Sequence, residues 1–286
     1  MEATQIDAGE FRAGQRRDWG TAAKGWYDWQ ELMFGATAPV SERIVEMAGV
    51  KPGDHVLDVA AGSGEPALTA ARVVGENGRI VATDISPEML AYGRERASAA
   101  GIDNVEFVET DASSLDFPPD TFDAAVSRWG IIFEPQAEAA AARVRGFLKP
   151  GTRMAISSWG PPDRVPILGL PMRTILTRLD KSPPPPGTPG PLSRPTPEAI
   201  SSLLEGGGFT DIEVDQIEID FEWDSPEEFA SFTREIAPPL SALLANETPE
   251  VREETWAAVV EAARPHAGDD GRLRMTHLVL IAAGRA

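Results

Sequence analysis

Short apolar runs alternate with segments of helical periodicity between Lys51 and Trp159. This alternation is typical of βαβ units, in which helices connect parallel strands and cover both faces of the sheet. The apolar runs predict five strands, at residues 55–60, 79–85, 105–112, 122–129 and 153–159. The segments between them predict helices over 66–73, 87–100 and 137–147. We therefore expect an α/β fold with a mainly parallel sheet.

The alternation stops after Trp159. Residues 161–197 contain the run SPPPPGTPGPLSRPTP, which is too irregular for a core element and fits either a lid over a site or a surface linker. Regular patterns then predict a helix over 197–205, a strand near 211–223, helices over 225–244 and 249–263, and a strand within 272–285. Because the late order is strand, insertion, strand, we expect the sheet to close with an antiparallel pair.

These patterns divide the chain into six parts. They are N-terminal lid helices (1–37), a Rossmann-like core (38–160), a proline-rich lid insertion (161–197), a core helix and strand (198–224), a helical cap insertion (225–268) and a final core strand (269–286).

The charge and the composition of the chain argue against several classes of partner and chemistry. The chain has 45 Asp plus Glu and 26 Lys plus Arg, a formal charge of −19, which disfavours nucleic acid as a partner. It has no Cys, which excludes disulfides, thiolate nucleophiles and Cys-based zinc sites. The N-terminus lacks an apolar signal segment and no run of eighteen apolar residues follows. We expect a cytoplasmic protein that does not insert into membranes.

A glycine turn follows the first predicted strand, in HVLDVAAGSGEPALTAA at residues 55–71. Residues 62–67 satisfy the dinucleotide pattern G-x-G-x-x-G/A, so an NAD(P)-dependent oxidoreductase stays open. A pyrophosphate at this turn would favour free N–H groups, whereas Pro66 has none and Glu65 is anionic. The turn therefore suits a ligand with little negative charge.

Three carboxylates stand at or near the ends of successive predicted strands: Asp58, Asp84 and Asp111. Ligands of open α/β sheets bind outside the carboxyl ends of the strands, so these side chains can converge on one crevice. Asp84 follows Gly64 by twenty residues, the interval expected of a ribose-binding carboxylate. Asp111 is placed to accept from an adenine amino group. The alternative is that Asp84 and Asp111 only cap the following helices.

The segments VLDVAAGSGEPALTAA, VATDISPEML, VEFVETDASSLDFPPDTFDAAVSRWGIIF and LKPGTRMAISSW resemble the consecutive motifs of class I S-adenosylmethionine (SAM)-dependent methyltransferases, of the ubiquinone/menaquinone-biosynthesis type. The resemblance spans residues 40–160. It implies a seven-stranded sheet with its last strand antiparallel, and SAM as cofactor with S-adenosylhomocysteine as product. It also implies cofactor contacts by Asp58, Ala60, Gly62, Gly64, Asp84, Ile85, Met89, Asp111, Ala112 and Ser127.

The implied reaction is methyl transfer to carbon or oxygen of a small, largely hydrophobic acceptor, such as a phenol, quinol, isoprenoid or other natural product. The resemblance does not extend to a quinone as the substrate, because SSWGPPDRVP departs from the run that quinone-methylating members carry after the fifth strand. A non-catalytic SAM-binding protein of the same fold is the other open alternative. The oligomeric state is expected to be monomer or homodimer.

Aromatic residues are the candidates for covering the site. Trp26, Trp29 and Met33 fall on one helical face, which indicates either a lid or packing against the core. By resemblance, Tyr27 is the best candidate to interact with the sulfonium and take part in catalysis. The candidates for the acceptor side are Trp29, Trp129, Trp159 and Arg173.

Arg128 is the candidate catalytic residue on the acceptor side, where it could bind an anion or stabilise a phenolate or enolate. Its alternative role is an ion pair with Glu134 or Asp111. None of the three His residues has metal-ligand spacing to another, and the fourth strand ends in Ser-Arg-Trp instead of a carboxylate. We therefore predict no catalytic metal and treat a general base as optional.

Overall fold

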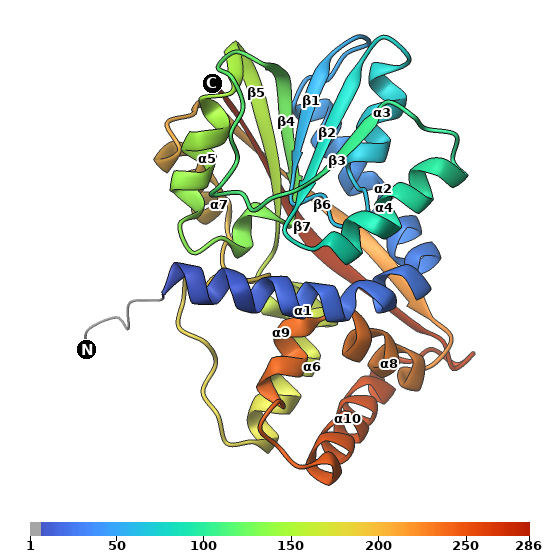
Figure 1. Ribbon diagram of the computed structural model, residues 1–286. Coiled ribbons are helices and arrows are strands. Elements are labelled where there is room, and N and C mark those ends of the chain that lie inside the picture. Colours follow the sequence, from blue (N-terminus) through green and yellow to red (C-terminus); the bar gives the residue numbers. More distant parts are fainter. Residues whose placement is uncertain (1–6) are drawn as a thin grey trace.

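A seven-stranded sheet in the order β3-β2-β1-β4-β5-β7-β6 forms the core of the computed structural model, which describes residues 7–286 (Figure 1). β7 is antiparallel to both β5 and β6, and the other pairs are parallel. The predicted fold class is confirmed. The strands are β1 His55–Val59, β2 Arg79–Asp84, β3 Val105–Glu109, β4 Phe122–Arg128, β5 Leu148–Trp159, β6 Thr210–Trp223 and β7 Leu273–Arg285.

Helices cover both faces of this sheet. α2 and α3 pack together on one face, and α5 and α7 pack together on the other (Figure 1). The central strands are mostly apolar because both of their faces are covered, as fully buried Val56 and Leu57 of β1 illustrate. The helices are α1 Ala8–Asp28, α2 Gln30–Met47, α3 Ala67–Val74, α4 Pro87–Ala99, α5 Ala137–Arg145, α6 Pro166–Arg178, α7 Pro197–Gly206, α8 Pro226–Ile236, α9 Pro238–Leu243 and α10 Pro249–Ala263.

Four helices begin with the same local signal, a Ser or Thr cap followed by proline. The cap hydroxyl accepts an N–H from the first turn, and proline tolerates the first helical position because no intrahelical partner awaits its missing N–H. The cap residues are Ser86 for α4, Thr196 for α7, Ser225 for α8 and Thr248 for α10.

A second layer of helices lies at the carboxyl ends of the parallel strands. α6, α8, α9 and α10 form this layer, and α1 crosses between it and the sheet (Figure 1). The single helix predicted over 225–244 is wrong: α8 and α9 are separate, because Pro238 and Pro239 cannot donate the N–H groups that a continuous helix needs. α2 also continues through the predicted boundary between residues 37 and 38.

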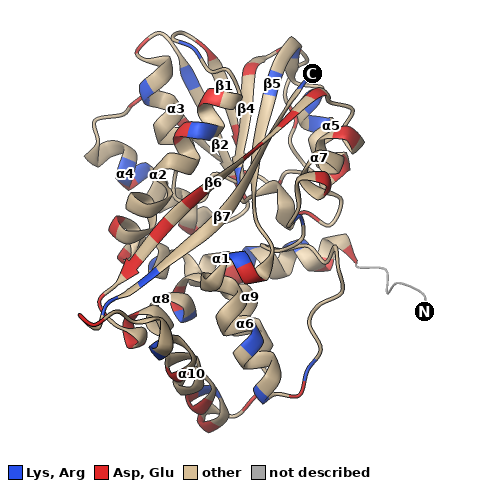
Figure 2. Cartoon of the chain, turned by 180° about the vertical axis from the view of Figure 1, so that it is seen from behind, with Lys and Arg blue, Asp and Glu red and all other residues tan. Residues whose placement is uncertain are grey.

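β6 is the outer strand of the sheet, and acidic side chains follow its length (Figure 2). Over its second half exposed Glu218, Asp220 and Glu222 alternate with buried Ile219 and Phe221, as the sequence pattern predicts. Several of the acids form ion pairs with arginine, among them Arg164–Glu218 and Arg274–Glu222. A charged outer strand resists pairing with the edge of another molecule.

Candidate active site

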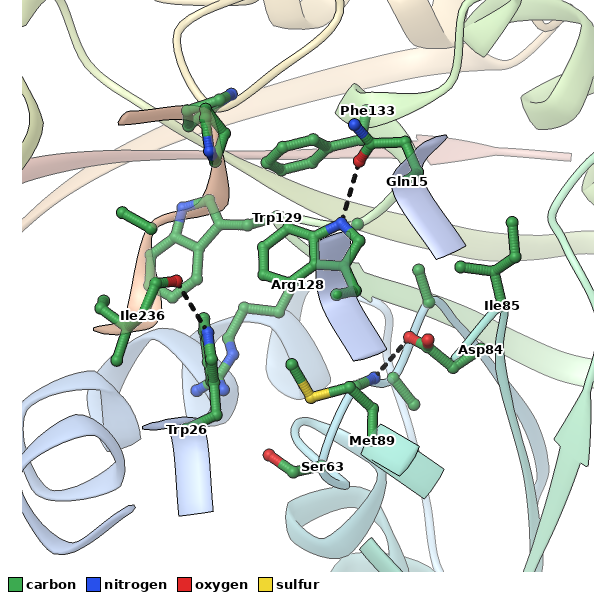
Figure 3. A pocket seen from close by; sticks show the side chains of 18 of the residues that line it. Gln15, Trp26, Ser63, Asp84, Ile85, Met89, Arg128, Trp129, Phe133 and Ile236 are labelled. Atoms are coloured by element: carbon green, nitrogen blue, oxygen red, sulfur yellow. Dashed lines mark hydrogen bonds between the residues drawn. The ribbon is translucent and has the colours of Figure 1, made fainter. Parts of the chain in front are cut away.

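A cavity opens at the carboxyl ends of β1, β2 and β4, under α1 and the second helical layer (Figure 3). The hollow spans about 1420 Å³, counted together with the space that is open to solvent. One end is formed by the glycine turn and the strand-end carboxylates Asp84 and Asp111. The other end is apolar and aromatic. The two ends of the cavity therefore differ in chemistry, one polar and acidic and the other apolar.

The glycine turn brings backbone against the carboxylate of Asp84. Ala60 and Gly62 adopt left-handed backbone angles, with φ of 57° and 55°, which reverse the chain directly after β1. The N–H of Gly62 donates to Asp84 Oδ2 at 2.8 Å, and the N–H of Ser86 donates to Oδ1 at 2.8 Å. Burial raises the pKa of Asp84 to about 6, against the opposing effect of these hydrogen bonds.

Asp111 lies farther along the same end of the cavity, just after β3. Its carboxylate accepts the backbone N–H of Ser113 at 2.9 Å and stands 3.9 Å from Arg12 Nε. Burial opposes ionisation of Asp111, but hydrogen bonds from the hydroxyls of Ser113 and Ser114 and the charge of Arg12 outweigh it and lower the pKa. Arg12 also donates to Glu134 Oε2 at 3.1 Å.

One face of α1 forms the roof. Arg12, Gln15, Trp19 and Trp26 all line the cavity. The indole N–H of Trp19 donates to Gln15 Oε1, and that of Trp26 donates to the carbonyl of Ile236 at the end of α8, both at 2.9 Å (Figure 3). Sequence reasoning missed Arg12 and Gln15, although spacings of three, four and seven residues along a helix were the signal that could have found them.

Two stacked indoles form a wall of the aromatic end. Trp129 follows β4 and Trp159 ends β5, and their rings lie 4.2 Å apart at an interplanar angle of 9°. Trp129 has a left-handed backbone, with φ of 52°, which is a strained conformation for a large side chain. Its backbone N–H donates to Ser157 Oγ at 3.1 Å, while its buried indole N–H has no partner in residues 7–286.

The structure places ten of the predicted site residues on the cavity wall and six elsewhere. Those on the wall are Ala60, Gly62, Asp84, Ile85, Met89, Asp111, Ala112, Arg128, Trp129 and Trp159. Those elsewhere are Tyr27, Trp29, Asp58, Gly64, Ser127 and Arg173.

Three of these six lie on or next to the helices that cover the site but do not line the cavity. The Tyr27 hydroxyl donates to Glu95, and its ring stacks on Tyr92 of α4, so it faces away from the cavity that neighbouring Trp26 lines. Trp29 donates to Glu235 Oε2 at 2.8 Å and contacts Phe232, which ties α8 to the start of α2. Arg173 is exposed to solvent on α6.

The other three lie behind the cavity wall. Asp58 is fully buried, burial raises the pKa of its carboxyl, and neither of its oxygens has a hydrogen-bond partner in the described chain. Gly64 packs against Leu68 inside the turn. The Ser127 hydroxyl donates to the carbonyl of Val59, which joins β4 to β1 just below the turn.

Arg128 does not form the ion pair that sequence analysis offered as its alternative role. The cation beside Glu134 and Asp111 is Arg12, which comes from α1, 116 residues earlier in the chain. Arg128 Nη1 instead donates to the hydroxyls of Thr37 at 2.8 Å and Ser41 at 3.0 Å, both on α2.

His277 is a buried core residue whose Nδ1 has no hydrogen-bond partner in residues 7–286. Its Nε2 accepts the backbone N–H of Ile167 at 3.0 Å, and burial lowers its pKa to about 4, so the ring is neutral at pH 7. Within residues 7–286, no group of three or more His, Asp or Glu side chains is arranged to hold a metal ion. No helix of the same part of the chain is long and apolar enough to cross a membrane.

The strand order, the antiparallel β7 and the cavity at the strand ends agree with the fold that the resemblance to class I methyltransferases implied. Residues 56–151 match the family model described as a methyltransferase domain. The ubiquinone/menaquinone biosynthesis C-methyltransferase UbiE of Teredinibacter turnerae is 37% identical over 119 residues, 41% of this chain and 48% of that protein.

A second relative, the uncharacterized protein Rv1405c of Mycobacterium tuberculosis, is 37% identical over 122 residues, 43% of each chain. The chain therefore spans about half the length of the curated relatives that it matches.

Solved structures share the fold at lower identity. The [4+2]-cyclase SpnF is 21% identical with a TM-score of 0.52, covering 86% of this chain and 80% of its own. A phosphoethanolamine N-methyltransferase 2 of Haemonchus contortus is 22% identical with a TM-score of 0.52, covering 86% and 52%. Because one fold supports different reactions, these likenesses describe the scaffold, and the reaction has to be argued from the site.

Proposed function

We propose that this protein transfers a methyl group from SAM to carbon or oxygen of a small, largely hydrophobic acceptor. The observation that carries the proposal is that one cavity joins two different ends. One end offers the strand-end carboxylates Asp84 and Asp111 beside a glycine turn. The other end offers aromatic walls. An adenosine-bearing methyl donor and an apolar acceptor could lie in contact there.

The donor end suits adenosine. Asp84, held by two backbone N–H groups, presents carboxylate oxygens for the two ribose hydroxyls. Asp111 stands one strand farther out, where it can accept from the adenine amino group. Ile85 and Ala112 line the cavity beside them and offer apolar surface to the purine ring.

The bound donor would supply a methyl group already activated on a sulfonium. The chain's own task is then to align the acceptor with that methyl group and to exclude water. Trp129, Trp159, Ile167, Leu168 and Phe221 provide an apolar enclosure for this purpose. The bound donor would keep the electron pair of its broken carbon–sulfur bond as a neutral thioether, and the proton that the acceptor carbon or oxygen loses would go to solvent.

An NAD(P)-dependent oxidoreductase fits the same cavity less well. The carboxylate of Glu65 lines the cavity at the turn where a pyrophosphate would lie, and Pro66 offers no N–H there. Protection against thermal unfolding by NAD(P)H and not by SAM or S-adenosylhomocysteine would reverse this preference.

The direct test is incubation of the protein with methyl-labelled SAM and a panel of phenols, quinols and isoprenoids, with amines as a further class. Transfer of label to a phenol, quinol or isoprenoid would support the proposal. Tight binding of SAM without transfer to any member of the panel would favour a non-catalytic SAM-binding protein. Transfer to amines alone would contradict the expected acceptor atom.

The pKa of Asp84 predicts how cofactor affinity depends on pH. We expect affinity for SAM to fall as pH decreases from 7.5 to 5, because protonation near pH 6 removes the charged acceptor of the ribose hydroxyls. The loss approaches about tenfold per pH unit below the midpoint if only the carboxylate binds. Titration calorimetry across this range measures it, and pH-independent affinity would contradict the role of Asp84.

The raised pKa of Asp84 affects folding stability in the direction opposite to its effect on cofactor affinity. The pKa of Asp84 is raised from 3.8 to about 6, so the folded protein holds this proton more tightly than the unfolded chain. Its contribution to stability is therefore present below the lower value and is lost as pH rises through the higher one. Ligand-free stability and cofactor affinity should respond to Asp84 in opposite directions over this window.

A further inference from the structure

Arg128 is a buried cation whose charge no carboxylate neutralises directly. Only 7% of its surface is exposed, and its Nη1 is held by the hydroxyls of Thr37 and Ser41. In the chain from residue 7 onward, no Asp or Glu oxygen lies within 4.0 Å of it. Burial lowers its pKa to about 10, which shows how strongly the enclosed charge is disfavoured. A buried cation without a neighbouring anion is stabilised when an anionic ligand binds beside it.

A carboxylate stands at the same end of the cavity. Glu65 lines the cavity at the glycine turn, and its charge acts on Arg128 without a direct contact. Its Oε2 accepts the hydroxyl hydrogen bond of Thr69 at 2.7 Å, and Arg96 lies 3.3 Å from its Oε1. Arg96 also donates to the carbonyl of Ser63 at 2.6 Å, which fixes the turn and the acid together.

The order of the strands orients a ligand between these groups. Asp111 follows β3, Asp84 ends β2, the glycine turn follows β1 and Arg128 ends β4, and these four strands are neighbours in that order. A ligand with its adenine at Asp111 and its ribose at Asp84 therefore extends across the turn toward Arg128. The far end of that ligand meets a cation and an anion at once.

We propose that Arg128 binds the carboxylate of the amino-acid end of SAM, and that Glu65 faces its ammonium group. This inference rests on the proposed function and assigns Arg128 to the cofactor, whereas sequence analysis placed it with the acceptor. The planar guanidinium can donate two N–H groups to one carboxylate, and the hydroxyls of Thr37 and Ser41 orient it beforehand. Arg96 acts as a positioning residue through its contacts with Ser63 and Glu65.

The test compares two ligands that differ only at this end. S-adenosylhomocysteine carries the amino acid, whereas 5′-methylthioadenosine keeps adenine, ribose and thioether but lacks it. We expect Arg128→Gln to weaken S-adenosylhomocysteine about 10- to 100-fold and to change methylthioadenosine affinity less than twofold. Arg128→Lys, which keeps the charge but not the fork, should give a smaller loss. Calorimetry measures all the affinities.

Two control variants test whether the effect is specific to the amino-acid end of the ligand. Asp84→Asn should weaken both ligands by the same factor, because both contain the ribose. Arg43→Gln should change neither, because Arg43 lies on the outer side of α2 and pairs with Asp215 at 2.7 Å. Retained binding of methylthioadenosine also shows that the Arg128 variants are folded.

Three outcomes would overturn the inference. Unchanged affinity of Arg128→Gln for S-adenosylhomocysteine would return Arg128 to the acceptor side. Equal losses for both ligands would show that Arg128 only supports the shape of the cavity. If the unmodified protein bound neither ligand, the proposed function would fail first, and this assignment would fail with it.

Discussion

Replacing Asp84 with asparagine is expected to weaken binding of SAM and S-adenosylhomocysteine about 100-fold. The amide keeps the shape of the side chain but loses the charge that two ribose hydroxyls would share. It also turns an NH₂ group toward a backbone N–H that now donates to the carboxylate, from either Gly62 or Ser86. Methyl transfer at low SAM concentration should fall by the same factor.

Calorimetry and initial rates over a range of SAM concentrations measure this effect. Asp123→Asn is the matched control, because Asp123 accepts the backbone N–H of His55 at the opposite end of the sheet. Its variant should bind the cofactor as the unmodified protein does. Equal affinities of the Asp84 and Asp123 variants would show that Asp84 serves only to hold the glycine turn.

Gly130→Ala is expected to lower the free energy of unfolding by about 3 kcal/mol. Gly130 follows Trp129 where the end of β4 passes the end of β1. A Cβ there would lie 2.5 Å from the Cβ of Ala60, 2.9 Å from the Oγ of Ser127 and 2.9 Å from the carbonyl oxygen of Val59. The first and last of these atoms cannot move by side-chain rotation, so the two strand ends must separate.

Chemical denaturation measures this loss, and the melting temperature should fall by roughly 5 to 10 °C. Gly35→Ala provides the control, since Gly35 lies exposed within α2 and has no atom within 4 Å of its added Cβ. That substitution should stabilise the protein by about 0.5 to 1 kcal/mol through helix propensity. Similar stability of both variants would contradict the close approach at Gly130.

The sequence predicted the place of a site residue best where a single rule of sheet geometry fixes that place. Parallel strands bring their carboxyl ends to one edge, so the segments carrying Asp84 and Asp111 sufficed to predict that both would face a common cavity. Arg128 shows the limit of such rules. The acids offered as partners in its alternative role pair with Arg12 instead, and the packing of α1 across the strand ends brings Arg12 there.

The cover of the site shows a second limit. Successive residues on a helix point about 100° apart, so a small rotation of α1 decides whether Trp26 or Tyr27 faces the cavity. The aromatic cluster was visible in the sequence, but the rotation depends on contacts with Tyr92 and Ile236, more than sixty residues away. The cytoplasmic location, the oligomeric state and the absence of a nucleic-acid partner stay predictions.

The pairing of β6 with β7 has a consequence for how this protein can be redesigned. Trp223 and Leu273 are register partners, so α8, α9 and α10 leave and re-enter the sheet at adjacent points. A segment held in this way can be exchanged or lengthened at modest entropic cost, because its ends stay closed by the strands. Chimaeras that exchange residues 224–272 should therefore keep the donor end of the cavity and replace only the part of its wall that Thr233, Ile236, Ala237 and Pro239 supply.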